Sequence, residues 1–330
     1  MSGGALVVGV VGAGRVGAVL GAALAAAGHT MVAVSAGSDA SHARAALLLP
    51  QVPIRSADDV ARAATDLLLL AVPDDALAGL VTGLHATGAL QPTAVVAHTS
   101  GAHGLAVLGD VAGAALHPAM TFTGEAADLD RLPGIAWGVT AVDRAFAARI
   151  VTDLGGVPEW IAEEARPLYH AALAHGANHL VTLVNEAADL LRAAGVADPG
   201  RVLAPLLHAA LDNALRLGDA ALTGPVSRGD AGTVAKHLQR MPAEFVPAYL
   251  ALARRTADRA LASGHLDRQD AALLLDVLTR LDVLARPQDK APPSPRDLGV
   301  VVGTHREESR VRATTSPRSR DSEGARDERT

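Results

Sequence analysis

A glycine-rich segment directly after the first apolar run constrains this chain more than any other feature. Residues 5–11 read ALVVGVV, which predicts a buried strand, and the Ala-rich residues 18–27 have helical spacing. Between them lies GAGRVG, which gives the order of a dinucleotide-binding site: strand, glycine turn, helix. The first glycine permits the tight turn, the second lets a pyrophosphate approach the backbone, and the third lets helix and strand pack closely. The amide groups at the helix start attract the anion. We therefore expect a nucleotide cofactor at this segment, the alternative being a glycine-rich turn without a ligand; its residues are Gly12, Ala13, Gly14, Arg15, Val16 and Gly17.

Composition and missing motifs exclude several classes of protein. The chain has no cysteine, which rules out disulfides and thiolate metal ligands. His175 and His179 alone share helical i,i+4 spacing, without the glutamate of a zinc-protease helix, so we expect no metal site. A serine hydrolase is disfavoured because no GxSxG elbow follows a strand. The net charge of −6 argues against nucleic acid as a partner. With no signal peptide and no long apolar stretch, we expect a cytoplasmic protein that does not enter the membrane.

The pattern of apolar residues changes along the chain and predicts three regions. Residues 1–157 alternate between short apolar runs and helical spacing, which predicts a doubly wound parallel sheet of the Rossmann-like type, with strands near 5–11, 31–35, 66–72, 94–98, 113–117 and 135–140. Residues 158–286 predict an all-helical second domain, with helices at 166–195, 199–217, 231–240, 243–264 and 267–285. Residues 287–330 are polar and mixed in charge, which predicts a disordered tail.

The segment after the second strand bears on the choice of dinucleotide. An NAD site places an acid there for the ribose hydroxyls, but this chain has Ser35, and no acid occurs before Asp39. Ser35, Ser38 and Arg44 can hold a 2′-phosphate instead, which favours NADP over NAD. The alternative for Arg44 is a solvated helix face. The segment after the third strand also faces the cofactor crevice and adds the candidates Ala71, Val72 and Pro73.

Two histidines follow predicted strands, where ligands of open α/β sheets bind. His98 and Ser100 follow the fourth strand, and Ser100 can donate to a carbonyl or carboxylate or, alternatively, cap the next helix. His117 follows the fifth strand, and Pro118 keeps it extended. The alternative for His117 is a satisfied loop histidine.

The helical region supplies the remaining candidates. His170 and Asn178 are eight residues apart on one predicted helix, so both can face one side, as a proton donor and a carbonyl-orienting amide. The alternative is a polar seam between helices. Arg228 is a candidate carboxylate clamp because its guanidinium is planar and always charged. Asp230 is a second substrate-binding candidate or the cap of the next helix.

Taken together, the segments GVVGAGRVG, DLLLLAVPDDAL, HTSG, LHPAMTF, YHAALAHGANHLV and TGPVSRGD resemble a bacterial family over residues 5–285. This family pairs a Rossmann-like domain with a helical domain of unknown function and includes the PanG-type ketopantoate reductases. The resemblance implies a nicotinamide cofactor, a helical domain that dimerises, and a more distant likeness to the β-hydroxyacid dehydrogenase superfamily. Two departures from this family stand out: Gly37 is near the position of an arginine, and Ala177 replaces a serine. The more distant classical ketopantoate reductases use a lysine on a helix of the second domain, and here no lysine lies between 162 and 195.

Three hypotheses about function follow. The first is an NADP-dependent oxidoreductase that reduces a small 2-keto acid, with 2-dehydropantoate (ketopantoate) as the leading substrate. His170 would protonate the alkoxide, Asn178 and Ser100 would orient the carbonyl, and Arg228 would hold the carboxylate. The second is a reductase of a cyclic imine or another carbonyl compound. The third is a nucleotide-binding sensor without turnover, which needs the glycine loop alone.

Overall fold

The structure, a computed structural model, describes residues 4–285; the tail predicted at 287–330 lies outside them. The chain forms two compact units, one up to Pro205 and one from Leu206 onward. No helix within residues 4–285 is long and apolar enough to cross a membrane. The predicted division after residue 157 stays a prediction, although the residues directly after it still form a strand of the first unit.

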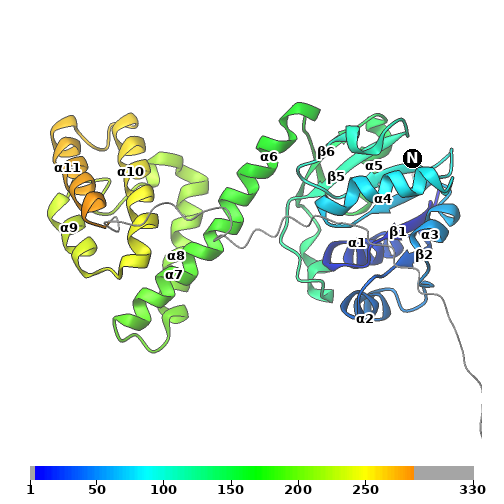
Figure 1. The fold of residues 1–330 in the computed structure, drawn as a ribbon, viewed down its shortest axis with the longest axis horizontal. Helices are drawn as coiled ribbons and strands as arrows, with labels where there is room; N and C mark the ends of the chain where they lie inside the picture. Colours follow the sequence, from blue (N-terminus) through cyan, green and yellow to red (C-terminus); the bar gives the residue numbers. More distant parts are fainter. Residues whose placement is uncertain (1–3, 286–330) are drawn as a thin grey trace, which may run out of the picture. The chain divides into compact units, whose positions relative to one another are not determined.

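The first unit contains a seven-stranded sheet of the order β2-β1-β3-β4-β5-β6-β7 (Figure 1). The strands are β1 (Val7–Val11), β2 (Thr30–Ser35), β3 (Leu67–Leu70), β4 (Val95–His98), β5 (Gly113–Pro118), β6 (Ala136–Ala141) and β7 (Val157–Trp160). Adjacent strands are parallel except β5 and β6, which pair antiparallel. The predicted Rossmann-like fold is therefore confirmed, and the sheet is parallel apart from this one pair. The strand order reverses between β1 and β3, where such sheets bind ligands.

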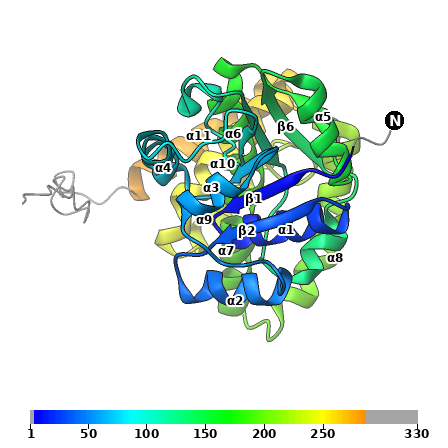
Figure 2. The ribbon, with the colours of Figure 1, turned by 90° about the vertical axis from the view of Figure 1, so that its right-hand side faces the viewer.

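Helices cover both faces of this sheet. Alternate side chains of a strand point to opposite faces, and in β3 the pair Leu67 and Leu69 belongs to one core cluster while Leu68 and Leu70 belong to the other. Figure 2 shows the helices on either side of the strands. The first cluster includes buried residues of α1 (Arg15–Ala26) and α5 (Arg144–Asp153), and the second those of α3 (Ala57–Ala63) and α4 (Asp74–Ala86).

Two elements of this unit are absent from the sequence prediction. Helix α2 (Asp39–Leu48) has little amphipathic pattern and depends on a capping box between Ser38 and Ser41. Strand β7 is short, contains Pro158 and is mostly exposed, as an edge strand is. Neither element carries the apolar periodicity on which the prediction relied.

The helix predicted at 166–195 is interrupted. It consists of α6 (Arg166–Leu173), a π-helical turn η4 (Ala174–Asn178) and α7 (His179–Ala193). The helices that follow agree with the prediction within a few residues: α8 (Pro199–Leu217), α9 (Ala231–Arg240), α10 (Val246–Ala262) and α11 (Arg268–Ala285). The second unit has its own apolar core, formed by α9, α10 and α11.

Candidate functional site

The glycine loop between β1 and α1 has the geometry that a dinucleotide needs. Gly12 has φ of 100°, and a Cβ atom there would lie 2.6 Å from the Ala71 carbonyl oxygen. A Cβ atom at Gly17 would collide with the Gly12 carbonyl. Side chains at these two positions would break the loop itself, because both conflicts are with backbone.

Gly14 differs from these two glycines. A Cβ atom there would meet no protein atom within 4 Å, so the space beside it is open. Gly14 is the N-cap of α1, whose first turn has neither a capping side chain nor an acid. The amides at this helix start therefore remain available to a phosphate. The loop thus fits the pyrophosphate of a dinucleotide.

The two serines predicted to hold a 2′-phosphate already take part in local hydrogen bonds. The Ser35 hydroxyl accepts from the Gly12 amide at 3.0 Å and so supports the glycine loop. The Ser38 hydroxyl accepts from the Ser41 amide at 3.3 Å and caps α2. Their roles toward a cofactor stay predictions.

Two arginines meet beside the glycine loop. A Cβ atom at Gly124 would lie 2.7 Å from Nε of Arg44 and 3.0 Å from Cγ of Arg15, so both side chains pack on this bare turn. The turn is fixed by Asp128, a fully buried carboxylate that accepts from the amides of Thr123 and Gly124, each at 2.8 Å. The arrangement brings the side chain of Arg44 to the same turn as that of Arg15, which itself belongs to the loop that would hold the cofactor phosphates.

A cavity of about 200 Å³ lies beyond β5. It combines four polar side chains with five apolar residues, and its lining residues are His117, Ala119, Met120, Thr121, His170, Leu173, Ala174, Ala177 and Asn178. Three of the four predicted catalytic residues thus share one cavity. Its size suits a small substrate, and its polar groups suit a carbonyl.

The π turn explains how two of these residues come to share the cavity. In a continuous α-helix, eight residues correspond to about 800°, which puts His170 and Asn178 about 80° apart. The His179 amide bonds to the Ala174 carbonyl, an i→i+5 bond that accommodates one extra residue. The extra residue removes about 100° and leaves the two side chains within about 20° of one face.

Bare glycine backbone lets the aromatic rings of α6 approach the sheet. A Cβ atom at Gly138 of β6 would lie 2.5 Å from the Tyr169 ring, and one at Gly101 would lie 2.7 Å from His170 and 3.0 Å from His117. The rings of His117 and His170 are nearly perpendicular, with centroids 6.0 Å apart. The Tyr169 hydroxyl lies 2.9 Å from Nδ1 of His117.

A buried arginine supports this cluster. Arg166 is fully buried and donates to the Ser100 carbonyl at 2.6 Å, to the Thr140 hydroxyl at 3.1 Å and to the Gly138 carbonyl at 3.3 Å. Its Nε has no hydrogen-bond partner within the described residues. Burial lowers the pKa of Arg166, yet a guanidinium stays charged at neutral pH. It therefore links β6, α6 and the HTSG segment around a single positive charge.

This environment keeps the nearby histidines neutral. Burial lowers the pKa of His117 to about 4, and the Arg166 charge and His170 act in the same direction. Burial also lowers the pKa of His98 to about 4, against the effect of a hydrogen bond to the Gly104 backbone. Both imidazoles are uncharged at pH 7 for this reason.

His98 and Ser100 shape the HTSG segment and do not line the cavity. His98 is fully buried, with Nε2 2.9 Å from the Gly104 carbonyl and Nδ1 accepting from the Ser100 amide at 3.2 Å. The Ser100 hydroxyl accepts from the His103 amide at 3.1 Å, within the turn before the next helix, whose N-cap is Gly104 and not Ser100. A role of either residue toward a substrate stays a prediction.

Arg228 and Asp230 belong to the unit that begins at Leu206. Arg228 is exposed. Asp230 accepts from the Thr233 amide at 2.9 Å and is the N-cap of α9. Their substrate-binding roles stay predictions.

Three contributors to the site are missing from the sequence prediction: Arg166, Tyr169 and Thr121. Arg166 directly precedes Pro167, so in the sequence it looks like an ordinary helix start. Its position between the last strand and the first long helix is the one feature that could have marked it as a site residue. Tyr169 adjoins His170, and the aromatic content of only 2% makes any tyrosine noteworthy.

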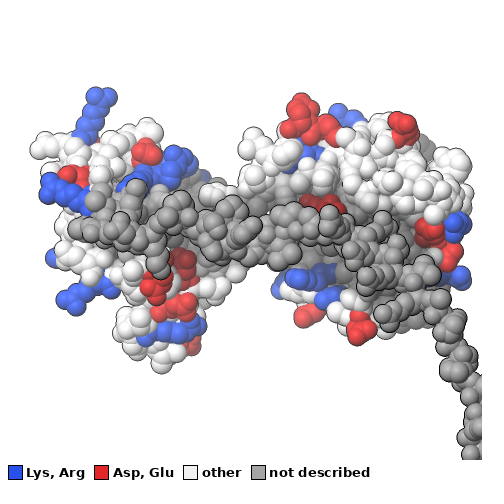
Figure 3. Space-filling view, in the orientation of Figure 1, with Lys and Arg blue, Asp and Glu red and all other residues white. Residues whose placement is uncertain are grey.

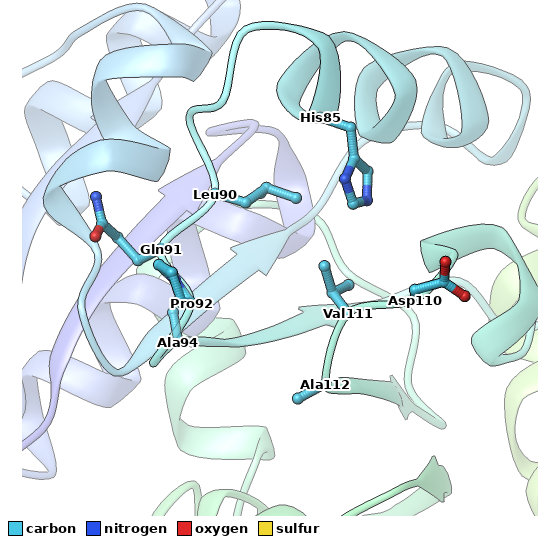
Figure 4. Close-up of a pocket in the computed structure, with 8 residues that line it drawn as sticks. All are labelled: His85, Leu90, Gln91, Pro92, Ala94, Asp110, Val111 and Ala112. Atoms are coloured by element: carbon cyan, nitrogen blue, oxygen red, sulfur yellow. The ribbon is translucent and has the colours of Figure 1, made fainter.

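A second pocket, of about 300 Å³, lies at the opposite edge of the sheet (Figure 4). Its residues Ala94 and Ala112 directly precede β4 and β5, so it lies at their amino ends. Its titratable residues are His85 and Asp110, and Nε2 of His85 lies 3.3 Å from the Leu108 carbonyl. Because open α/β sheets bind ligands at the carboxyl ends of strands, the cavity beyond β5 is the better candidate.

Comparisons with family models agree with this architecture. A model described as a Rossmann-like domain matches residues 1–120, and the domain of unknown function DUF2520 matches residues 135–256. The chain therefore combines these two domain types. No curated protein matched the sequence of this chain.

Solved structures show the same fold. A candidate NADP oxidoreductase from Bacteroides fragilis is 24% identical, with a TM-score of 0.65, covering 77% of this chain and 98% of that one. A protein from Thermotoga maritima is 19% identical, with a TM-score of 0.54 and coverage of 83% and 99%. The pyrroline carboxylate reductase of Plasmodium falciparum, solved with NADP bound, is 11% identical, with a TM-score of 0.52 and coverage of 82% and 98%.

Proposed function

We propose that this protein is a nicotinamide-dependent oxidoreductase that reduces a small 2-keto acid, with ketopantoate as the leading substrate. The observation that carries the proposal is the joint presence of His117, His170 and Asn178 in one small cavity beyond β5. The glycine loop lies at the same carboxyl edge of the sheet, directly after β1 and therefore beside the reversal of strand order between β1 and β3. The fold shared with an NADP-bound reductase adds support.

In a carbonyl reduction, the residues of the cavity would have two roles: to donate a proton and to orient the carbonyl group. When bound, the reduced nicotinamide supplies a hydride to the carbonyl carbon. As the C=O π electrons move to oxygen, His170 gives its proton to that oxygen and later regains one from water. Asn178 and His117 orient the carbonyl by hydrogen bonds. The role of Arg228 toward a substrate carboxylate stays a prediction from the sequence, and Ser100 is kept as a further polar candidate.

The cofactor we propose is NADP. Arg15 and Arg44, which meet at Gly124, supply two positive charges for a 2′-phosphate. The segment after β2 has Ser35 where an NAD site has an acid. The resemblance implies an arginine near position 37, but this chain has Gly37 there. We therefore assign the 2′-phosphate to Arg15 and Arg44.

The experiment that tests this function is a substrate panel with both cofactors. Ketopantoate, other small 2-keto acids and cyclic imines are each mixed with NADPH or NADH, and the absorbance of the reduced nicotinamide is followed. We expect oxidation of NADPH by at least one keto acid. Replacement His170→Ala should lower kcat/KM by about 10²- to 10⁴-fold at nearly constant cofactor affinity. An unchanged rate would remove His170 as the acid.

Two other functions are outcomes of the same panel. Turnover of cyclic imines alone would favour an imine reductase. The fold that this chain shares with the pyrroline carboxylate reductase of Plasmodium falciparum supports this alternative. Binding of NADPH without any oxidation would favour a nucleotide sensor.

We further propose that the functional form is a homodimer. Helix α7 has no buried residue in the single chain, and Leu180, Val181 and Leu183 on it are 39%, 61% and 42% exposed. Leu168 of α6 is 75% exposed. Faces of this kind mark association surfaces. Sedimentation should find a dimer, and a pure monomer at micromolar concentration would contradict this.

A further inference from the structure

We infer that Tyr169 is a positioning residue for the proposed reduction: its hydroxyl donates to Nδ1 of His117 and holds this imidazole in the tautomer that presents Nε2–H to the substrate oxygen. The inference rests on the proposed function for its kinetic consequence. The tautomer itself can be observed without turnover.

The first argument is the geometry of the pair. The Tyr169 oxygen lies 2.9 Å from Nδ1 of His117, and the rings are nearly perpendicular, at 87°, with centroids 5.6 Å apart. Tyr169 reaches this place because Gly138, the antiparallel partner of His117 in β6, has no side chain. A larger residue at Gly138 would displace the ring.

The second argument concerns the direction of the hydrogen bond. A neutral imidazole has one donor and one acceptor nitrogen. Burial raises the pKa of Tyr169, against the Arg166 charge and a hydrogen bond from the Gly138 backbone, so the phenol keeps its proton. A protonated phenol 2.9 Å from a ring nitrogen can donate its proton to that nitrogen. Nδ1 is then the acceptor, and Nε2 carries the proton.

The third argument is the charge around His117. Arg166 and His170 on α6 disfavour the imidazolium, and so does His98 on β4, while Asp74 at the start of α4 acts weakly the other way. Burial is the largest influence and disfavours the charged form too. The ring is therefore a neutral hydrogen-bond donor at the pH of the reaction.

The fourth argument is the free edge of the ring. Nε2 of His117 has no hydrogen-bond partner among residues 4–285. It lies 3.0 Å from the place of a Cβ atom at Gly101, where no side chain stands. His117 itself lines the cavity. A neutral N–H donor recognises an acceptor oxygen, so the group it selects is a carbonyl or hydroxyl oxygen.

The chain supplies its own control. It contains only two tyrosines, and the second, Tyr249, lies 2.9 Å from Nδ1 of His237 with rings at 88°. His237 is exposed on α9, in the other unit. Tyr249→Phe therefore removes the same kind of hydrogen bond away from the cavity.

The experiment records the ring nitrogens of His117 by ¹⁵N NMR at pH 7 in the full-length wild type, Tyr169→Phe and Tyr249→Phe, with His117→Gln for assignment. We expect the Nε2–H form in the wild type and in Tyr249→Phe, and a shift toward Nδ1–H in Tyr169→Phe. A wild-type Nδ1–H form, or the same tautomer in Tyr169→Phe, would overturn the inference. Thermal unfolding checks that the variants are folded.

Kinetics on an active substrate complete the test. Tyr169→Phe should lower kcat by about 10- to 100-fold, as for other orienting partners of histidines, at constant affinity for NADPH. Tyr249→Phe should leave kcat unchanged. If no substrate is reduced but the tautomers are as stated, the proposed function fails and the positioning of His117 stands. A normal kcat in Tyr169→Phe with a changed tautomer would exclude the positioning role.

Discussion

The two units of this protein each contain a histidine and a tyrosine in nearly the same arrangement. The distance from the tyrosine oxygen to Nδ1 is 2.9 Å in both pairs, and the rings are close to perpendicular in both. The pair His117–Tyr169 lines or borders a cavity beside a buried arginine. The pair His237–Tyr249 joins two helices at an exposed histidine.

The comparison teaches that pair geometry alone does not make a site. What distinguishes His117 is its surroundings: a polar cavity, the buried Arg166 charge, and glycine backbone that leaves room for a ligand. Around the exposed pair, charges are solvated, and Figure 3 shows basic and acidic side chains interspersed on the visible face of the described chain. Variants in the two units, and variants that remove His117 or the buried Arg166 charge, can test this difference.

Replacing the histidine of each pair should give the largest difference in kcat/KM between the two pairs. His117→Ala should lower kcat/KM by about 10²- to 10³-fold, the effect of one preorganised donor, whereas His237→Ala should leave it unchanged. Steady-state kinetics with NADPH and the active keto acid provide the measurement. Equal losses in both variants would show that the cavity is not the reaction site.

Removing the buried charge tests the support of the cavity. Arg166→Met removes the donor of three buried hydrogen bonds, so the free energy of unfolding should fall by about 3 to 5 kcal/mol. The matched variant is Arg259→Met, which removes an exposed arginine paired with Asp219 and should cost at most about 1 kcal/mol. Urea unfolding measures both, and similar losses would contradict the role of Arg166.

The pH dependence of stability tests the neutrality of His117. Its pKa is about 4 when folded and 6.5 as a model value, so the folded state binds fewer protons between these values. Stability is therefore full above pH 6.5 and decreases as the pH falls toward 4, by at most about 3 kcal/mol for this group. In His117→Gln this decrease should be smaller, with the remainder assigned to His98. An identical pH profile in the variant would contradict a neutral buried His117.

Local sequence patterns were sufficient for the glycine loop, the positions of the first six strands along the chain and most helices, because each is encoded by a contiguous segment. They failed for contacts that join distant segments. Tyr169 reaches His117 because Gly138, which pairs with His117, has no side chain. The sequence near residue 169 contains no sign of this contact. The antiparallel β6 and the π turn depend on packing for the same reason.

The strand-end rule also has a limit that His98 illustrates. His98 is the last residue of β4 and therefore lies at the carboxyl edge of the sheet, in line with the sequence prediction. The direction of its side chain, into the protein and onto the Gly104 carbonyl, follows from the tertiary structure. His117, near the end of β5, lines the cavity instead.

The central claim is that the glycine loop and the cavity beyond β5 form one nicotinamide-dependent site, and NADPH titration of Gly14→Ala tests it most directly. Added methyl groups meet no protein atom at Gly14 or at the control Gly79, so both variants should remain as stable as the wild type. We predict saturable binding of NADPH to the wild type and to Gly79→Ala, and affinity about tenfold or more weaker in Gly14→Ala, because its methyl group occupies the path of the pyrophosphate. Absence of saturable binding of both NADPH and NADH to the wild type, or equal affinity in all three proteins, would contradict the account.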